Sequence, residues 1–332
     1  MTKYRIAKIP GDGIGPDVMA AAVKVLEVVE ETRDIGFDFV ELEVGDALKA
    51  RTGVALPPGT IEEIEKSDAG LFAAVGETAK EVILPMRQEL DLFVNLRPAK
   101  VYPNVPHLKE DVDIVMVREN TEGIYKMIGD RGDGWGFNVR VITTKASERI
   151  ARWAFDYAVK YEREKVTCVH KSNVLDKSCG VFQEACQHVA GSYPNIEYDE
   201  VIVDACAMRL ILRPEAFDVI VTTNLFGDIL SDEAAGLVGG LGMTPSGNIG
   251  DNNAVFEPIH GTAPRLAGTG RANPMATILS AGMMLDWLGE RNAATSIEDA
   301  VIEVLNEAKT LTPDLGGSAG TMDVAAAVSA KL

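Results

Sequence analysis

Short apolar runs alternate with longer segments of helical periodicity along most of the chain, and this alternation restricts the fold more than any other feature. The apolar runs predict strands at residues 5–9, 37–43, 69–75, 113–117, 165–169, 196–203 and 219–222. Apolar side chains at intervals of three and four residues predict helices at residues 17–31, 60–66, 147–160, 177–189 and 275–288. Strands that alternate with helices indicate an α/β fold with a largely parallel central sheet.

The composition is that of a globular protein and argues against several classes of partner. With 332 residues, of which 46% are apolar, the chain is long enough for one large or two ordinary domains. A net charge of −18 disfavours a nucleic-acid surface and an anionic membrane surface. No apolar run reaches the length of a membrane span, and the first residues lack a signal-peptide core. We therefore expect a cytoplasmic protein without a membrane or nucleic-acid partner.

The cysteines show neither a CxxC pair nor the spacing of a zinc or redox motif; they are Cys168, Cys179, Cys186 and Cys206. We expect them to be buried free thiols, as is usual in a reducing compartment.

Two glycine-rich stretches interrupt the pattern. Residues 236–250 contain six glycines, which predicts either a loop around a ligand or a crossing between domains. Residues 315–320 precede a final helix that Thr321 is expected to cap.

A third glycine segment, PGDGIGP at residues 10–16, follows a predicted strand and precedes a helix. It does not have the G-x-G-x-x-G spacing of the Rossmann dinucleotide fingerprint, because the last glycine comes one residue early. Pro16 is suited to the first turn of a helix, and the glycines permit a tight turn. We therefore expect a turn rather than a standard dinucleotide loop.

The motif NLFGDILSD at residues 224–232 places Asp228 and Asp232 four residues apart, directly after an apolar run. On a helix this spacing puts both carboxylates on one face, a turn apart. Two like charges there favour a hard divalent cation between them, although a solvated acidic helix start is the alternative. Asp204, at the end of the predicted strand 196–203, is a third candidate ligand.

Three arginines lie in separate segments where they could bind an anionic substrate: Arg87, Arg97 and Arg118. A guanidinium at the end of a strand can hold a carboxylate through two hydrogen bonds, whereas each arginine alone could equally be a surface residue. Tyr125 follows the segment of Arg118, and Lys171 follows the apolar strand at residues 166–170. Both side chains could transfer protons once burial or a neighbouring charge tunes them.

Taken in order, these segments resemble the isocitrate/isopropylmalate dehydrogenase family of metal-dependent β-decarboxylating dehydrogenases. The resemblance covers essentially the whole chain and rests on PGDGIGP (10–16), DLFVNLRPAK (91–100), VRENTEGIY (117–125), HKSNVL (170–175), NLFGDILSD (224–232) and FEPIHGTAP (256–264). It implies a two-domain α/β fold that is not a Rossmann fold. Residues 1–92 and 239–332 would form a discontinuous cofactor-binding domain, and residues 93–238 a dimerisation domain that carries the metal and substrate site.

The resemblance also implies the roles of individual residues. The substrate carboxylates would be bound by Arg87, Arg97 and Arg118. Mg²⁺ or Mn²⁺ would be held by Asp228 and Asp232, with Asp204 donated by a second subunit close to the substrate. Lys171, from the same second subunit, would be the general base and Tyr125 the general acid, so the active site would require a homodimer or a higher oligomer. The cofactor would contact Asn95, Asn173, His260, Gly261, Thr262, Ala263, Pro264, Arg265 and Asn273.

The segment before Arg87 indicates the substrate. Isocitrate-specific relatives place Ser and Asn there, whereas this chain has Ile83 and Leu84. A third carboxylate against this apolar wall would lack donors, so an aliphatic substituent is expected. The stretch GETAKEVI is similar to that of archaeal members that oxidise 3-isopropylmalate to 2-oxoisocaproate in leucine biosynthesis. Homoisocitrate, isocitrate and 3-methylmalate remain alternatives.

Arg265 leaves the choice of cofactor open between NAD⁺ and NADP⁺. NAD-dependent relatives usually carry an Asp at this position, which binds the ribose diol. An arginine removes that acid and could bind a 2′-phosphate. Alternatively, Arg265 points to solvent and NAD⁺ binds through the remaining residues.

Two functions of other classes use some of the same residue types. A Mg²⁺-dependent phosphoryl-transfer enzyme could use paired aspartates and arginines, but the chain has no P-loop or kinase signature. A non-catalytic nucleotide-binding module would need neither Lys171 nor Tyr125.

Overall fold

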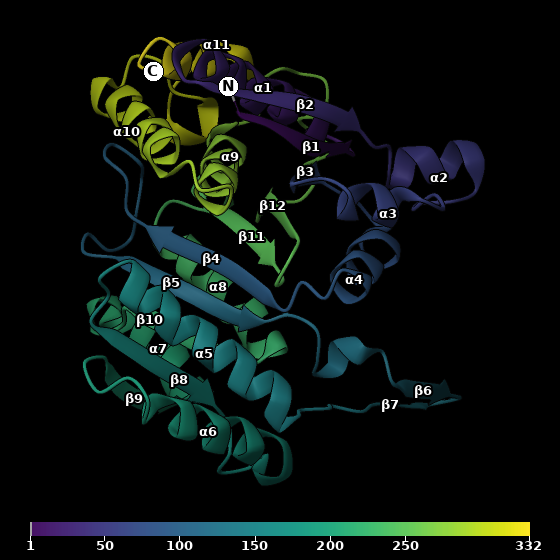
Figure 1. Cartoon of the computed structure of the whole chain (residues 1–332), viewed down its shortest axis with the longest axis vertical. Helices are drawn as coiled ribbons and strands as arrows, with labels where there is room; N and C mark the ends of the chain where they lie inside the picture. The colour runs from purple at the N-terminus through teal and green to yellow at the C-terminus, as the bar shows by residue number, and fades with distance from the viewer. Residues whose placement is uncertain (1) are drawn as a thin grey trace.

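A single ten-stranded sheet runs through the length of the molecule in the computed structural model, which describes residues 2–332 (Figure 1). Its strands, in spatial order, are β2 (Ile35–Glu41), β1 (Thr2–Gly11), β3 (Ala69–Ala74), β12 (Ala254–Pro258), β11 (Pro245–Ile249), β4 (Val94–Lys100), β5 (Asp113–Glu119), β10 (Val219–Thr222), β8 (Lys165–His170) and β9 (Glu197–Ile202). A separate hairpin of β6 (Gly129–Gly132) and β7 (Trp135–Asn138) projects from the body of the molecule.

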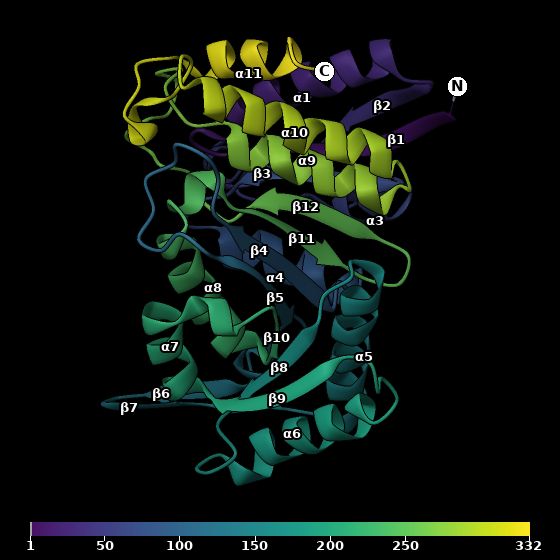
Figure 2. The ribbon, with the colours of Figure 1, turned by 90° about the vertical axis from the view of Figure 1, so that its left-hand side faces the viewer.

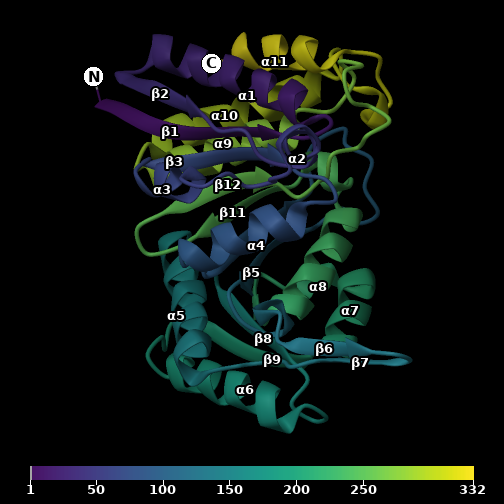
Figure 3. The same cartoon turned by 90° about the vertical axis from the view of Figure 1, so that its right-hand side faces the viewer.

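Helices cover both faces of the sheet. They are α1 (Gly15–Thr32), α2 (Asp46–Thr52), α3 (Thr60–Glu65), α4 (Ala79–Glu89), α5 (Thr144–Lys160), α6 (Asp176–Ala190), α7 (Val203–Leu212), α8 (Asn224–Leu237), α9 (Met275–Trp287), α10 (Arg291–Glu307) and α11 (Thr321–Ser329). Figure 2 shows α9 and α10 on the near side of β11 and β12, and Figure 3 shows α4 from the opposite side. The half of the molecule with α1 and α9 to α11 uses both ends of the chain, whereas α5 to α8 surround the other half. The division into two domains at residues 92 and 239 remains a prediction from the sequence.

The α/β fold is confirmed, and six of the nine strand pairings in the sheet are parallel, as expected, but the centre of the sheet is antiparallel. Its two outer parts are parallel, whereas β12 pairs with β11, β11 with β4, and β4 with β5 in antiparallel fashion. The sequence pattern predicted β5, at residues 113–117, but not β12, β11 or β4. Segments such as PSGNI and VNLRPAK place proline, glycine and polar side chains at buried positions, which is unusual for strands.

Two local predictions are wrong. Strand β9 ends at Ile202 and α7 begins at Val203, so Asp204 lies in the first turn of a helix and not at a strand end. Gly320, rather than Thr321, occupies the cap position of α11, and its N–H donates to Asp323 Oδ2 at 2.9 Å. The Thr321 hydroxyl instead donates to the carbonyl of Ala272 at 2.7 Å.

Other predictions agree with the structure. The four cysteines are free and buried. Residues 236–250 run from the end of α8 to β11 at the centre of the sheet, and both alternatives for them, a loop around a ligand or a crossing between domains, stay predictions. Within residues 2–332, none of the helices is both long and apolar enough to span a membrane.

The central strands present polar side chains on one face of the sheet. In register, Asn248 of β11 lies beside Asn95 of β4, which lies beside Arg118 of β5. Because side chains alternate between the faces of a strand, Leu96 and Val117 point to the other face and join the main hydrophobic core. This register brings residues from three segments of the chain to one polar face.

Candidate active site

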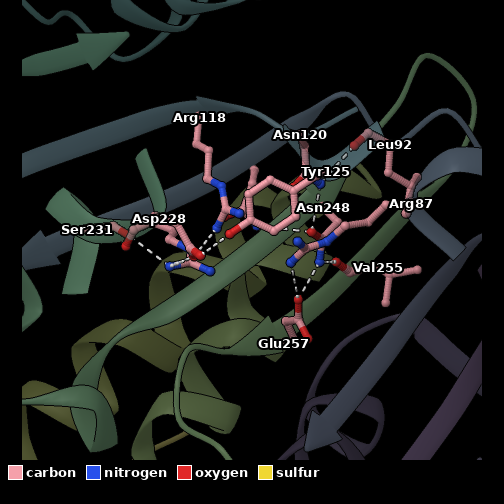
Figure 4. Close-up of polar contacts among 12 residues, drawn as sticks. Arg87, Leu92, Arg118, Asn120, Tyr125, Asp228, Ser231, Asn248, Val255 and Glu257 are labelled. Atoms are coloured by element: carbon pink, nitrogen blue, oxygen red, sulfur yellow. Dashed lines mark hydrogen bonds and ion pairs between the residues drawn. The ribbon is translucent and has the colours of Figure 1, made fainter. Parts of the chain in front are cut away.

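Three buried arginines converge beside α8: Arg87 from α4, Arg97 from β4 and Arg118 from β5 (Figure 4 labels Arg87 and Arg118). Their side chains have relative exposures of 9%, 10% and 1%. Burial, and then repulsion by Arg118, lower the pKa of Arg97 to about 10, and burial also lowers the pKa of Arg87. A cluster of positive charge with so little solvent is suited in its chemistry to bind a small polyanion.

One face of α8 holds two of these arginines. Asn224, Asp228, Ser231 and Asp232 follow one another at helical spacing on that face. Asn224 Oδ1 accepts hydrogen bonds from Arg118 Nε at 3.0 Å and Nη2 at 2.7 Å, while Asp228 Oδ1 binds Arg118 Nη1. Arg97 Nη1 donates to Ser231 Oγ at 2.7 Å and Asp232 Oδ1 at 3.2 Å. The helix therefore fixes the orientation of both guanidinium groups.

Gly227 explains how Arg118 can approach α8 so closely. A Cβ atom at this position would lie 2.6 Å from Cγ and 2.7 Å from Cβ of Arg118. The arginine stem thus occupies the space that a side chain would take. Glycine in the NLFGDILSD motif is required by this packing and not by its backbone angles.

Tyr125, in a short 3-10 helix (Ile124–Lys126), completes the group. Its hydroxyl donates to Asp228 Oδ2 at 2.6 Å, and its ring centroid lies 5.3 Å from the Arg118 guanidinium carbon. Burial and the bond to Asp228 raise the pKa of Tyr125. Burial acts to raise the pKa of Asp228, but Arg118, Tyr125 and the other arginines outweigh this and lower it. Asp228 is therefore a carboxylate beside a protonated phenol.

Asp228 and Asp232 supply two oxygen donors for a hard divalent cation, one turn apart on the site face of α8. Among the residues that the structure describes, no group of three or more His, Cys, Asp or Glu side chains could hold a metal. The two carboxylates suit Mg²⁺ or Mn²⁺ in their chemistry, but further ligands must come from substrate, water or another chain.

Lys171 and Asp204 form a second, separate group. Lys171 follows the end of β8 and makes an ion pair with Asp204 in the first turn of α7. The Asp204 side chain is 68% exposed. The predicted site residues are therefore found in two clusters within one chain, one around Asp228 and one around Lys171.

The predicted cofactor segment, residues 260–265, follows β12 and packs against the PGDGIGP turn. Ile14 N–H donates to the carbonyl of Thr262 at 2.9 Å, and a Cβ on Gly13 would lie 2.2 Å from the same oxygen. Asp12 accepts hydrogen bonds from Asp46 N–H at 2.8 Å and Ala47 N–H at 3.0 Å, which fixes the start of α2. The PGDGIGP turn therefore packs against residues 260–265 and fixes the position of their backbone.

The remaining predicted cofactor residues differ in exposure. Arg265 and Asn173 are exposed, whereas Asn273 is buried and donates to Asp314 Oδ2 at 3.0 Å. His260 Nε2 is a buried atom without a hydrogen-bond partner, and burial lowers the pKa of this histidine. Asn95 is fully buried and donates to Asn248 Oδ1 at 3.0 Å, so it lies beneath the site.

Sequence reasoning missed several residues that contact the arginines. Asn224, Gly227 and Ser231 lie inside the NLFGDILSD motif, and their helical spacing relative to Asp228 could have indicated a shared face. Glu257, which binds Arg87 Nη2 at 3.3 Å, and Asn248 belong to the central strands that the pattern did not predict.

The sequence matches the family model described as isocitrate/isopropylmalate dehydrogenase over residues 5–328. It is 50% identical to the 3-isopropylmalate dehydrogenase of Methanothermobacter thermautotrophicus over 332 residues, 100% of this chain and 99% of that protein. It is also 50% identical to the isocitrate/homoisocitrate dehydrogenase of Thermus thermophilus over 324 residues, 96% of this chain and 95% of that protein. The fold is similar to the crystal structure of isocitrate dehydrogenase from Methylococcus capsulatus, with a TM-score of 0.94, 42% identity and coverage of 99% of each chain.

Proposed function

This chain belongs to the isocitrate/isopropylmalate dehydrogenase family and is a β-decarboxylating dehydrogenase, and we propose that its substrate is 3-isopropylmalate. The reaction would yield 2-oxoisocaproate, CO₂ and a reduced nicotinamide cofactor. Family membership rules out the two alternative functions from other classes, the phosphoryl-transfer enzyme and the non-catalytic nucleotide-binding module.

The proposal of 3-isopropylmalate as the substrate rests on the apolar surface of α4. Ile83 and Leu84 precede Arg87 by four and three residues, so they share its helix face. Both are half-buried, and they offer no hydrogen-bond donor to a substituent of the bound malate. A carboxylate in this position would lose water without gaining a partner, whereas an isopropyl group would bury apolar surface. Overall sequence identity does not discriminate between the candidate substrates, because relatives named for different substrates are equally similar to this chain.

In the proposed mechanism the arginines bind the two malate carboxylates between α4 and α8. The substrate displaces part of their present bonding, since a carboxylate can accept two parallel hydrogen bonds from a guanidinium. Lys171 of a second subunit takes the hydroxyl proton, and Tyr125 gives a proton to the carbon that loses CO₂. Asp228 accepts the Tyr125 hydrogen bond and so holds the phenol toward the substrate.

Enzymes of this family generally use a divalent metal and NAD(P)⁺. We place the metal at Asp228 and Asp232, where, when bound, it withdraws electrons from the oxo acid during decarboxylation. We place the cofactor along residues 260–265, where, when bound, it accepts the substrate hydride. The buried Nε2 of His260, which lacks a partner, is consistent with a polar ligand at this segment.

We propose a homodimer in which each subunit contributes Lys171 and Asp204 to the site of the other; enzymes of this family typically dimerise. The surface near these residues is unusually apolar: Met208, Ile211 and Leu212 of α7 and Ile229 of α8 are 54–60% exposed. Apolar side chains also lie exposed on the β6–β7 hairpin, at Trp135 and Phe137. Patches of this kind mark surfaces that associate.

The cofactor preference depends on Arg265. The residue is exposed at the cofactor segment, where a guanidinium can meet a 2′-phosphate. We propose that the enzyme accepts NADP⁺. Kinetics with both cofactors test this idea: a strong NAD⁺ preference that Arg265→Asp leaves unchanged would contradict it.

The substrate proposal is tested by kcat/KM values for 3-isopropylmalate, 3-methylmalate, homoisocitrate and isocitrate, with Mg²⁺ and each cofactor. We expect 3-isopropylmalate to exceed 3-methylmalate by about 10-fold or more, because two further methyl groups contact the α4 wall. Homoisocitrate is the second candidate, favoured by the Thermus relative. A larger kcat/KM for homoisocitrate or isocitrate would refute the assignment.

A further inference from the structure

Arg87 is held at both its backbone and its side chain by one closed ring of hydrogen bonds (Figure 4). Its carbonyl accepts from Leu92 N–H at 2.9 Å, and the Leu92 carbonyl accepts from Asn120 Nδ2 at 2.9 Å. Asn120 Nδ2 also donates to Asn248 Oδ1 at 3.0 Å. Asn248 Nδ2 donates to Glu257 Oε1 at 2.7 Å, and the same oxygen accepts from Arg87 Nη2 at 3.3 Å.

The direction of every bond in this ring is fixed by the Leu92 carbonyl. A carbonyl can only accept, so the amide nitrogen of Asn120 must face it. The amide nitrogen of Asn120 then requires the oxygen of Asn248, which turns the Asn248 nitrogen toward Glu257. Asn95 Nδ2 also donates to Asn248 Oδ1, at 3.0 Å, and reinforces this orientation. Glu257 must therefore present an acceptor to both Asn248 and Arg87.

The members of the ring are too buried for water to substitute for lost partners. Asn248 and Asn95 are fully buried, Asn120 is 3% exposed and Glu257 is 7% exposed. The bonds also join four strand segments, because Asn95 lies on β4, Asn248 on β11 and Glu257 on β12, while Asn120 follows β5. In such buried surroundings each hydrogen bond is strong, and a donor or acceptor without a matching partner lowers the stability of the protein.

The ring leaves part of the guanidinium available. Glu257 engages Nη2, whereas Nε of Arg87 is a buried atom without a hydrogen-bond partner. An unpartnered donor of a buried arginine is suited to a carboxylate that arrives with the substrate.

From this geometry we infer that Asn248 is a positioning residue: through Glu257 it fixes the side chain of Arg87 so that Nε faces the substrate carboxylate. The inference rests on the proposed role of Arg87. Asn248 lies on β11, one strand away from β4, and its hydrogen-bonded link to the Arg87 side chain runs through Glu257. Its effect should therefore appear in substrate binding and not in the chemical step.

The test exchanges the amide of Asn248 and the carboxylate of Glu257, first at one position and then at both. Asn248→Asp places a second carboxylate against Glu257, so the two acids repel and Glu257 withdraws from Arg87. We expect the KM for the substrate to rise about 10-fold or more with kcat changed by less than about 3-fold. The double variant N248D/E257Q restores one carboxylate and one amide with the direction of their bond reversed. It should bring KM back to within about 3-fold of the parent value.

Each outcome decides the matter. A lower Tm for N248D with an unchanged KM, or a double variant whose KM stays as high as that of N248D, would overturn the inference. If N248D does not fold, Asn248→Ala carries the test, because it removes the donor that holds Glu257 without adding a charge; an unchanged KM overturns the inference. Arg87→Lys serves as the reference. If it raises KM whereas N248D does not, only the positioning role fails; if neither changes KM, the proposed role of Arg87 itself is wrong.

Discussion

Tyr125 donates its hydroxyl hydrogen bond to Asp228 Oδ2 at 2.6 Å, while the other oxygen of the same carboxylate binds Arg118. One carboxylate thus orients the proposed general acid and one of the substrate-binding arginines together. The Tyr125 ring also lies over the Arg118 guanidinium, with 5.3 Å between the guanidinium carbon and the ring centroid. Tyr125 and Arg118 are therefore fixed in one group against Asp228 of α8.

Tyr125→Phe should remove the proton donor but keep the ring above Arg118. We expect kcat to fall about 10²–10⁴-fold, the usual contribution of a general acid, while KM and Tm change little. Steady-state kinetics and thermal unfolding check this. A variant that keeps more than half of the parent kcat would show that another group supplies the proton.

Removal of the divalent metal should abolish turnover reversibly. A chelator is expected to lower the rate at least about 100-fold, because the metal contributes several kcal/mol to the transition state. Added Mg²⁺ or Mn²⁺ should restore the rate in the parent enzyme but not in Asp228→Asn, whose fold should be intact by circular dichroism. Full activity in the presence of the chelator would contradict a metal at Asp228 and Asp232.

Gly227→Ala should impair the site through Arg118. The added Cβ would lie 2.6 Å from Arg118 Cγ, so we expect a loss of about 1–3 kcal/mol in stability and a raised KM. Gly236→Ala on the same helix is the matched control, because its added Cβ meets nothing within 4 Å. The control should keep the parent KM. Equal kinetics for the two variants would mean that the Arg118 contact does not matter.

Leu212→Asp should separate the subunits. The side chain is 60% exposed in the single chain, and an unpaired charge in the proposed apolar interface is costly. Light scattering should detect a monomer, and activity should be lost because Lys171 no longer reaches the opposite site. Met322→Asp, an exposed apolar residue on α11, is the control and should remain dimeric and active. A dimeric Leu212→Asp variant would place the interface elsewhere.

The outer parallel strands and the helices α1, α5, α6 and α9 could be predicted because their apolar periodicity is strong, whereas α10, which is as long as α5, was missed. Residues 219–222 coincide with β10, and residues 275–288 differ from α9 at one residue. The antiparallel centre could not be predicted, since Asn248 and Asn95 occupy fully buried strand positions where the pattern requires apolar side chains. These asparagines are tolerated because they bond to one another, which only the three-dimensional register reveals.

The site could be predicted in part. The three arginines, Tyr125, Asp228 and Asp232 lie in recognisable motifs, and the structure brings them into one group. Glu257 and Asn248 could not be identified, because their function depends on bonds to residues far away in the sequence. Lys171 and Asp204 pair with each other instead of joining the group around Asp228, so the role that we propose for them would require a second chain.

The most direct test of the shared active site is to mix two inactive variants, Lys171→Met and Tyr125→Phe, under conditions that allow subunit exchange. In a mixed dimer one site lacks both residues, and the other site has both. We expect activity to recover to about a quarter of the parent value, since half of the dimers are mixed and each has one intact site. No recovery, with exchange verified by mass spectrometry of the dimers, would contradict a site built from Asp228 and Tyr125 of one subunit and Lys171 of the other.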